Sequence, residues 1–283
     1  MTTHSSLASV RATRERLVEL GLSTKKSFGQ HFLIDDGVVG KILRYAALPR
    51  NSSVVEVGPG IGTLTEALLA QQVRLTAIEL DDALHAGLAK HYSSLHLIGG
   101  DALAPETIAS LQELAPAYLV SNLPYAVAAT IILEYFQMLP SLEVATVMVQ
   151  REVAERIAAQ PSSKSYGSYT IKLNLLTRVV SQFNVSPQSF YPPPRVDSTV
   201  LRLERRHLYR DSIAKACMLA DAAFFQRRKT IRNSMQAYFA EHGLDEEKVD
   251  RLLTAAKINP SCRGEVLAAS DYLALAKVLE NLV

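Results

Sequence analysis

Short apolar runs alternate with helix-like patterns through the middle of the chain. Each run is a few residues long and apolar almost throughout, which is typical of strands buried on both faces of a sheet. After the first run, apolar residues recur at helical spacing, beginning at Ile61 and Leu64. Strands that alternate with helices predict a mostly parallel sheet covered by helices. The expected strands are 54–57, 75–80, 95–98, 118–120 and 144–149.

The flanking regions show different patterns. We expect a short basic helix over residues 9–20, an ordered loop over 23–34 and a helix over 36–48. Two β-rich runs, 168–180 and 196–203, are expected to finish the sheet.

After Arg206 the apolar residues keep helical spacing and no strand is evident, which predicts a small all-helical domain. The chain is therefore predicted to be an α/β protein. A Rossmann-like domain is expected at 23–206 and a helical domain at 207–283, with an N-terminal extension at 1–22 to which the sequence assigns no role.

Composition is that of a soluble globular protein, since 48% of the 283 residues are hydrophobic and 20% are charged. No stretch reaches about 18 apolar residues, so no membrane helix is expected, and the N-terminus lacks the apolar core of a secretory signal. The two cysteines, Cys217 and Cys262, have no histidine or cysteine at metal spacing. A cytoplasmic protein without a zinc site or disulfide framework is the expectation.

Charge is distributed unevenly. Residues 151–283 carry 20 basic and 14 acidic side chains, whereas residues 51–150 carry 2 and 10. Basic segments can neutralise nucleic-acid phosphates, although solvated helix faces give the same pattern. We interpret Arg227, Arg228 and Lys229 as a nucleic-acid contact, because they follow two phenylalanines that can face the core while the cations face outward.

A glycine-rich turn follows the first strand, with Gly58, Gly60 and Gly62 in alternate positions. Glycine allows a ligand to approach the backbone closely. Glu79 ends the second strand, where a doubly wound fold places a carboxylate on ribose hydroxyls. These features predict a nucleoside cofactor, and a purely structural turn is the alternative. The third position of a dinucleotide fingerprint is Thr63, and the Glu56 carboxylate suits a cation, so S-adenosylmethionine is favoured over NAD.

Two more motifs follow strands. Asp101 ends the third strand and is expected to accept a hydrogen bond from an adenine amino group, with a helix N-cap as the alternative. Asn122-Leu123-Pro124-Tyr125 ends the fourth. The Asn122 side-chain oxygen and the Leu123 carbonyl can accept both N–H bonds of an adenine N6 amine, and Tyr125 can stack on the purine. The alternative is a common Asn-x-Pro turn.

Several motifs together resemble one family. They are F-G-Q-H-F-L at 28–33, E-V-G-P-G-I-G-T-L-T at 56–65, I-E-L-D at 78–81, N-L-P-Y at 122–125, Q-R-E-V-A-E-R at 150–156, F-Y-P-P-P-R-V-D-S at 190–198 and F-F-Q-R-R-K-T-I-R-N-S at 224–234. Over roughly residues 23–283 the chain resembles the small-subunit ribosomal RNA adenine N6-dimethyltransferases.

The resemblance implies a Rossmann-like, S-adenosylmethionine-dependent methyltransferase domain that uses no metal. The implied reaction places two methyl groups on N6 of each of two adjacent adenosines, in a hairpin loop near the 3′ end of small-subunit rRNA. The implied partner is an immature 30S-type subunit, and we expect a cytoplasmic monomer that is not bound to a membrane.

The resemblance also implies residue roles. Catalytic roles fall to Asn122, Leu123, Pro124, Tyr125 and Phe190, where Phe190 pairs with Tyr125 to hold the flipped base. Cofactor contacts fall to His31, Leu33, Gly58, Gly60, Glu79, Asp101 and Asn122, and RNA contacts to Arg227, Arg228 and Lys229.

Three alternatives stay open. A large-subunit rRNA adenine methyltransferase that confers antibiotic resistance shares the first motifs. A DNA adenine methyltransferase usually has a further proline or an acidic residue in the tetrad. The chain could also act mainly as a non-catalytic assembly or transcription factor that retains the fold.

Overall fold

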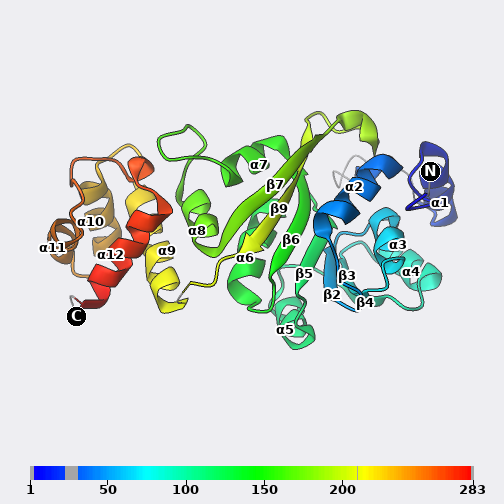
Figure 1. The fold of residues 1–283 in the computed structure, drawn as a ribbon, viewed down its shortest axis with the longest axis horizontal. Helices are drawn as coiled ribbons and strands as arrows, with labels where there is room; N and C mark the ends of the chain where they lie inside the picture. Colours follow the sequence, from blue (N-terminus) through cyan, green and yellow to red (C-terminus); the bar gives the residue numbers. More distant parts are fainter. Residues whose placement is uncertain (1–2, 23–30, 209, 282–283) are drawn as a thin grey trace. The chain divides into compact units, whose positions relative to one another are not determined.

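The computed structural model describes residues 3–22, 31–208 and 210–281, and the chain forms two compact units (Figure 1). Unit 1 consists of Met1–Ala154 and Val179–Arg205, and unit 2 of Glu155–Arg178 and Arg206–Val283. Each unit is therefore assembled from two separate segments of the chain.

Unit 1 is built around a sheet whose described strands follow the order β4-β3-β2-β5-β6-β9-β7. Strands β2 to β6 are parallel, and β9 is antiparallel to β6. The strands are β2 (Ser53–Val57), β3 (Arg74–Glu79), β4 (His96–Gly99), β5 (Tyr118–Asn122), β6 (Val144–Gln150), β7 (Thr177–Val185) and β9 (Ser198–Arg205). The predicted central strands and the run at 196–203 are confirmed to within a few residues.

The strand order changes direction at β2, because β3 and β4 extend the sheet to one side and β5 and β6 to the other. In open α/β sheets, ligands bind outside the carboxyl ends of the strands at such a switch point.

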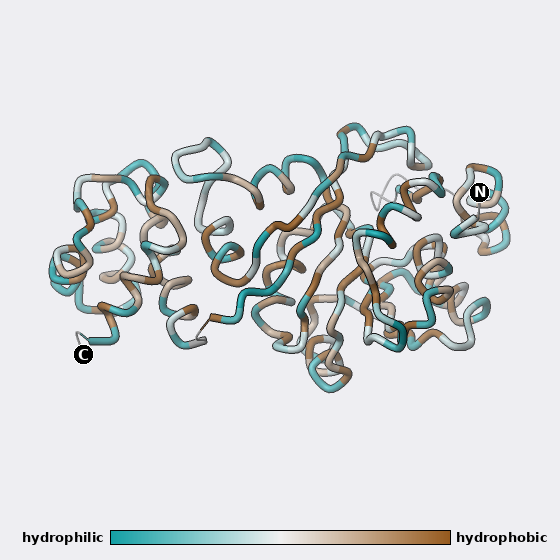
Figure 2. The backbone as a smooth tube through the Cα atoms, in the orientation of Figure 1, coloured by the Kyte–Doolittle hydropathy of each residue, from teal (hydrophilic) through white to brown (hydrophobic). Residues whose placement is uncertain are grey.

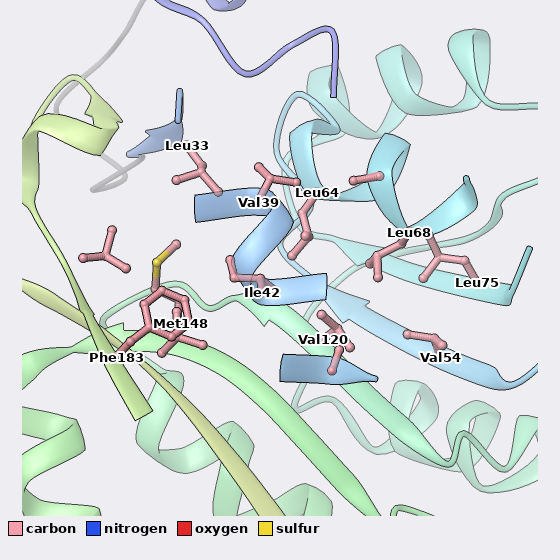
Figure 3. Packing of buried hydrophobic residues seen from close by; sticks show 14 of the residues in the cluster. Leu33, Val39, Ile42, Val54, Leu64, Leu68, Leu75, Val120, Met148 and Phe183 are labelled. Carbon is pink, nitrogen blue, oxygen red and sulfur yellow. The ribbon is translucent and has the colours of Figure 1, made fainter. Parts of the chain in front are cut away.

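Both faces of the central strands are buried. Successive residues Val54 and Val55 of β2 point to opposite faces of the sheet and are both 0% exposed, as expected for a strand covered on both sides. Hydrophobic residues lie along these strands (Figure 2). On one face they pack with Val39 and Ile42 and with Leu64 and Leu68 in a single cluster (Figure 3).

Some of the helices begin at a residue whose polar side chain caps them. Asp35 accepts a hydrogen bond from Val38 N, and Asp81 accepts from Ala83 N and Leu84 N. The described helices up to Ile157 are α1 (Val10–Glu19), α2 (Asp36–Ala46), α3 (Thr63–Leu69), α4 (Asp82–His91), α5 (Pro105–Leu114), α6 (Ala128–Met138) and α7 (Arg151–Ile157), the last of which crosses from unit 1 into unit 2. The predicted helices over 9–20 and 36–48 are confirmed as α1 and α2.

A small second sheet joins distant parts of the sequence. Strand β1 (Phe32–Leu33) pairs antiparallel with β8 (Phe190–Tyr191), which comes directly after the short 3-10 helix Pro187–Ser189. The end of the predicted loop over 23–34 is therefore a strand, and residues 23–30 lie outside the described part of the chain.

The described part of unit 2 is mainly helical, apart from the start of β7 at Thr177. It contains α8 (Ser168–Leu176), α9 (Arg210–Phe224), α10 (Ile231–Glu241), α11 (Lys248–Ala255), the 3-10 helix Gly264–Val266 and α12 (Ala269–Asn281). Among residues 206–208 and 210–281, no strand occurs, as the helical spacing predicts.

The strand predicted over 168–180 is wrong in its first part. Residues 168–176 form α8, and the strand begins at Thr177. Apolar residues alternate at Ile171, Leu173 and Leu175, which imitates a strand, but all three are buried in a helix that contacts α9 and α12. A helix covered on more than one side loses the 3.6-residue pattern.

Within the described ranges, no helix is long and apolar enough to cross a membrane.

Candidate functional site

A cavity of about 400 Å³ lies at the carboxyl ends of β2, β3 and β5, a size that suits a small molecule. Among the predicted site residues, the cavity wall includes His31, Leu33, Gly58, Gly60, Glu79, Asn122, Leu123, Pro124 and Tyr125. The other lining residues are Phe32, Glu56, Pro59, Thr63, Leu64, Leu80, Asp81, Asp82 and Leu84. The fold thus brings together motifs that are up to 94 positions apart in the sequence, from His31 to Tyr125.

The cavity wall is acidic. Glu56, Glu79, Asp81 and Asp82 contribute carboxyl groups, and the described lining residues include no lysine or arginine. A wall of one sign attracts the opposite charge. The cavity therefore suits a ligand with a positive charge, such as a sulfonium, and disfavours the pyrophosphate of a dinucleotide.

Two glycines shape the turn after β2. Gly58 has a φ of 66° and Gly60 a φ of 61°, in the left-handed region that favours glycine. A β-carbon on Gly58 would lie 3.0 Å from Pro124 Cγ, and one on Gly60 would lie 3.2 Å from the Phe32 ring. The turn therefore touches both the tetrad and strand β1.

Glu79 ends β3 and is 6% exposed. Its Oε2 accepts from Gly60 N at 3.0 Å, and its Oε1 accepts from Asp81 N at 3.0 Å. Burial raises the pKa of Glu79, and these two donors oppose the shift. Each oxygen keeps a further lone pair with which to accept a hydroxyl hydrogen bond from a ligand.

Glu56 is more deeply buried. It is 2% exposed, and its Oε2 accepts from Thr65 Oγ1 at 2.7 Å. Burial raises the pKa of Glu56 to about 8, and the nearby Glu79 charge adds to that shift. A cation in the cavity would favour the ionised form.

Thr63 carries an unused hydroxyl in the cavity wall. The residue is 4% exposed, and its Oγ1 has no hydrogen-bond partner among the described residues. A buried polar atom without a partner is costly, so this hydroxyl fits a polar group of a ligand.

Two acceptors of the tetrad are open. Asn122 Nδ2 donates to the His31 carbonyl oxygen at 3.3 Å, which leaves Asn122 Oδ1 as an acceptor. No described residue donates to Asn122 Oδ1 or to the Leu123 carbonyl, while Leu123 N donates to Met148 O at 3.1 Å. The pair can therefore accept two N–H bonds from an exocyclic amine.

Tyr125 is half-buried and held by its hydroxyl. That hydroxyl shares a hydrogen bond of 2.7 Å with Ser198 Oγ, and Ser198 is 0% exposed. The Tyr125 ring lies 5.7 Å from the His31 ring, and His31 Nδ1 donates to the Pro192 carbonyl at 2.7 Å. These contacts fix the Tyr125 ring in the cavity wall, next to the other residues of the tetrad.

A sequence profile of the family described as ribosomal RNA adenine dimethylase matches residues 21–275. The chain belongs to this family. The resemblance stated from the motifs is thereby confirmed, together with the class of enzyme that it implies, an rRNA adenine methyltransferase.

Curated relatives agree with the family. The chain is 37% identical to ribosomal RNA small subunit methyltransferase A of Acidothermus cellulolyticus, covering 93% of this chain and 92% of the relative. It is 36% identical to the protein of that name from Enterococcus faecalis, covering 99% of each. The corresponding protein of Mycobacterium tuberculosis is 40% identical, with 92% and 84% covered.

Solved structures confirm the predicted α/β methyltransferase fold. A dimethyladenosine transferase from Plasmodium falciparum has a TM-score of 0.70 at 23% identity, covering 89% of this chain and 98% of that one. The 23S rRNA methyltransferase ErmE has a TM-score of 0.60 at 24% identity, covering 88% and 99%.

Two of the predicted catalytic and cofactor residues lie outside the cavity lining. Asp101 is exposed, and its Oδ1 accepts from Leu103 N at 2.9 Å. It makes a local turn, whereas the N-cap of α5 is Ala104. Phe190 is 2% exposed and packs in the core cluster beside Leu33, with which β8 pairs.

The predicted RNA contacts in unit 2 differ in their surroundings. Arg227 Nη2 donates to the carbonyls of Lys164 and Tyr166 at 2.9 and 3.1 Å, so it ties the fold of unit 2 together. Arg228 and Lys229 are exposed and have no ion-pair partner among the described residues. The expectation that both preceding aromatics face the core is wrong for Phe225, which is 39% exposed.

Sequence reasoning missed Phe32, Thr63 and Ser198. All three lie inside motifs that carried the family resemblance, but nothing in the sequence says which neighbours they meet. Among the described residues, no group of three or more His, Cys, Asp or Glu could hold a metal ion.

Proposed function

We propose that the cavity of unit 1 binds S-adenosylmethionine and that the protein dimethylates N6 of two adjacent adenosines in a hairpin loop near the 3′ end of small-subunit rRNA. The relatives' name, ribosomal RNA small subunit methyltransferase A, supports the substrate. The observation that carries the proposal is that Asn122 and Leu123, whose two acceptors are unpaired among the described residues, line a cavity whose wall is acidic.

The residues of the cavity fit this cofactor, which supplies a methyl group on a sulfonium when it is bound. Glu79 accepts from the ribose hydroxyls, and Glu56 faces the cationic part of the molecule. Gly58 and Gly60 let the backbone approach it, while His31 and Leu33 close the wall. Asp101 accepts from the adenine amino group at the end of β4, where Gly100 N donates to Glu79 O at 3.0 Å.

The tetrad orients the target amine. Asn122 Oδ1 and the Leu123 carbonyl accept its two N–H bonds, which would hold the amine nitrogen in the pyramidal form that can accept a methyl group. Tyr125 stacks on the flipped base with Phe190 as its aromatic partner, and Pro124 holds the turn against Gly58. A loop adenosine costs less to unstack than one in a duplex. Catalysis then rests on orientation and desolvation, with no metal and no general base.

The two predicted domains have different tasks. Residues 23–206 carry the chemistry, and 207–283 bind RNA, with Arg228 and Lys229 as phosphate contacts and Arg227 as their support. The substrate is an immature 30S-type subunit, and the protein works as a monomer in the cytoplasm without a membrane partner.

The test is the Asn122→Ala variant. We expect it to lower turnover about a hundredfold or more, because a transition-state hydrogen bond is lost, while RNA binding stays close to normal because phosphates supply most of it. Near wild-type turnover would show that the tetrad is only a turn.

Mapping the modified nucleotides identifies the substrate. Mass spectrometry of rRNA from cells lacking the protein should show two unmethylated adenosines in small-subunit rRNA. A loss confined to large-subunit rRNA would favour the resistance methyltransferase. If Asn122→Ala restores subunit maturation without methylation, the assembly-factor alternative is supported.

A further inference from the structure

We propose that residues 4–20, here called the N-terminal brace, are a positioning element of the cofactor cavity. The inference rests on the proposed function, since it assigns the cavity to S-adenosylmethionine. The brace holds the wall formed by Phe32 and the glycine turn, and so sets cofactor affinity.

Phe32 needs such support, because its strand β1 is two residues long and pairs only with the two residues of β8 in the described structure. A pair this short is weakly fixed by hydrogen bonds alone. Phe32 is 6% exposed, and its side chain packs in a cluster with Leu7 and Leu17 of the brace and with Ile61 and Leu84. Phe32 and Leu84 also line the cavity.

The contacts continue from Phe32 to Glu79, whose carboxylate is proposed to bind the cofactor. The Phe32 ring lies against Gly60, where an added β-carbon would be 3.2 Å from it. Gly60 N in turn donates to Glu79 Oε2 at 3.0 Å. A displacement of Phe32 therefore acts on the donor that orients Glu79.

Polar contacts tie the brace to the helix after the glycine turn. Glu66 of α3 accepts from Ser5 Oγ at 2.8 Å and from Ser6 N and Ser6 Oγ at 2.9 and 2.8 Å. Asp36 of α2 accepts from His4 N and Ser5 N, each at 2.9 Å. The start of the brace thus joins α2 to α3.

The other end of the brace reaches α4 and β8. Glu19 pairs with Lys90 at 3.0 Å, and Leu20 fills the space beside Gly87, where a β-carbon would come within 2.5 Å of it. Arg14 Nε donates to Tyr191 Oη at 3.0 Å, and its guanidinium lies over the Tyr191 ring. Tyr191 is the residue that pairs with Phe32 across the small sheet.

The test compares two neighbouring positions of α1. Leu17 is 4% exposed beneath Phe32, whereas Val18 is 78% exposed. We expect Leu17→Ala to raise the dissociation constant for S-adenosylmethionine about fivefold, measured by calorimetry well below the unfolding temperature. Val18→Ala should leave it unchanged, and the volume-conserving Leu17→Met should restore most of the affinity.

Kinetics separates positioning from a loss of folded protein. In Leu17→Ala the KM for S-adenosylmethionine should rise, while kcat and the KM for the ribosomal substrate stay close to wild type. If Leu17→Ala does not fold, the double variant Ser5→Ala with Ser6→Ala removes hydroxyl donors to Glu66 and should raise the dissociation constant about twofold or more.

The proposal is overturned if a folded Leu17→Ala protein keeps the cofactor affinity of the wild type. If Leu17→Ala does not fold, unchanged affinity in the Ser5→Ala, Ser6→Ala double variant overturns it. Glu79→Ala is measured alongside. If it also leaves affinity unchanged, the proposed cofactor site is wrong, whereas a loss in Glu79→Ala alone rejects only the role of the brace.

Discussion

Removing the Thr63 hydroxyl is expected to weaken ligand binding without lowering the stability of the protein. Its buried Oγ1 has no partner in the described structure, so Thr63→Val removes a hydroxyl that stabilises nothing there. We expect the free energy of unfolding to stay the same or to rise by up to about 1 kcal/mol, while S-adenosylmethionine affinity falls about three- to tenfold. Denaturant unfolding and calorimetry measure the two quantities.

The matched control for this change is Thr65→Val. Thr65 Oγ1 donates to Glu56, so its loss should lower the free energy of unfolding by about 1–3 kcal/mol. Equal stability losses in the two variants would contradict the assignment of Thr63 to the ligand.

Glu56 predicts how stability depends on pH. Its folded-state pKa of about 8 exceeds the ordinary glutamate value of about 4.3, so the folded protein binds an extra proton between these values. The stability that the protonated Glu56 contributes is therefore fully present below about pH 4.3. The free energy of unfolding falls as pH rises toward 8, by at most about 1.4 kcal/mol per pH unit.

The measurement is denaturant unfolding at pH 5, 6, 7 and 8 without cofactor. Glu56→Gln should flatten the profile and leave a smaller slope from Glu79, whose pKa is also raised by burial. Parallel profiles for the wild type and Glu56→Gln would reject this account of the site.

At the residue scale, the sequence predicts the polar and glycine positions that come after each strand. Gly58, Glu79 and Asn122 lie at the ends of apolar runs, and parallel strands bring their carboxyl ends to one edge. Ser198 meets Tyr125 only because β9 inserts antiparallel beside β6, and no local pattern encodes that pairing. Asp101 is placed equally well after a strand but lies outside the cavity lining, since β4 is the edge strand.

At the element scale, the pair β1–β8 gives Phe190 two separable roles. The residue is 2% exposed in the core cluster, and it is also proposed to hold the flipped base. Phe190→Ala should lower the free energy of unfolding by about 3–5 kcal/mol because it leaves a cavity. Denaturant unfolding checks this value.

Phe190→Leu distinguishes the two roles. It should keep most of the packing and cost less than about 1.5 kcal/mol, so a strong fall in kcat in this variant would assign the aromatic ring to the base. If Phe190→Leu retains full turnover, Phe190 acts only by packing.

Elements buried on both sides divide into those that the sequence predicts and those that it does not. Strand β2 is short, lies between turn signals and is apolar on both faces, so its pattern has one interpretation. Helix α8 begins after Gly167 and carries Tyr169, Thr170 and Ile171, residue types common in strands. Its helical state comes from packing with α9 and α12, which are distant in the sequence.

At the scale of the whole molecule, the two units are expected to contribute to different kinetic constants. Replacing both Arg228 and Lys229 by alanine removes two exposed cations from unit 2 and should raise the KM for the ribosomal substrate about tenfold. The slope of log affinity against log salt should fall by about 2, because each phosphate contact releases about one counterion. S-adenosylmethionine affinity should be unchanged.

A charge-matched control is Lys257→Ala with Lys277→Ala, since both lysines are exposed in unit 2. The control should alter the KM for the ribosomal substrate much less than the Arg228 and Lys229 pair does. Equal effects would mean that overall charge, and not this location, attracts the RNA.

The interrupted path of the chain through its two units has a consequence during translation. Helix α8 leaves the ribosome before β9, yet its partners α9 and α12 are synthesised after β9. During that interval, α9 and α12 are not yet present to bury the apolar side chains of Ile171, Leu173 and Leu175. The nascent chain therefore passes through a stage that chaperones can recognise, and its second unit closes only once α12 has emerged.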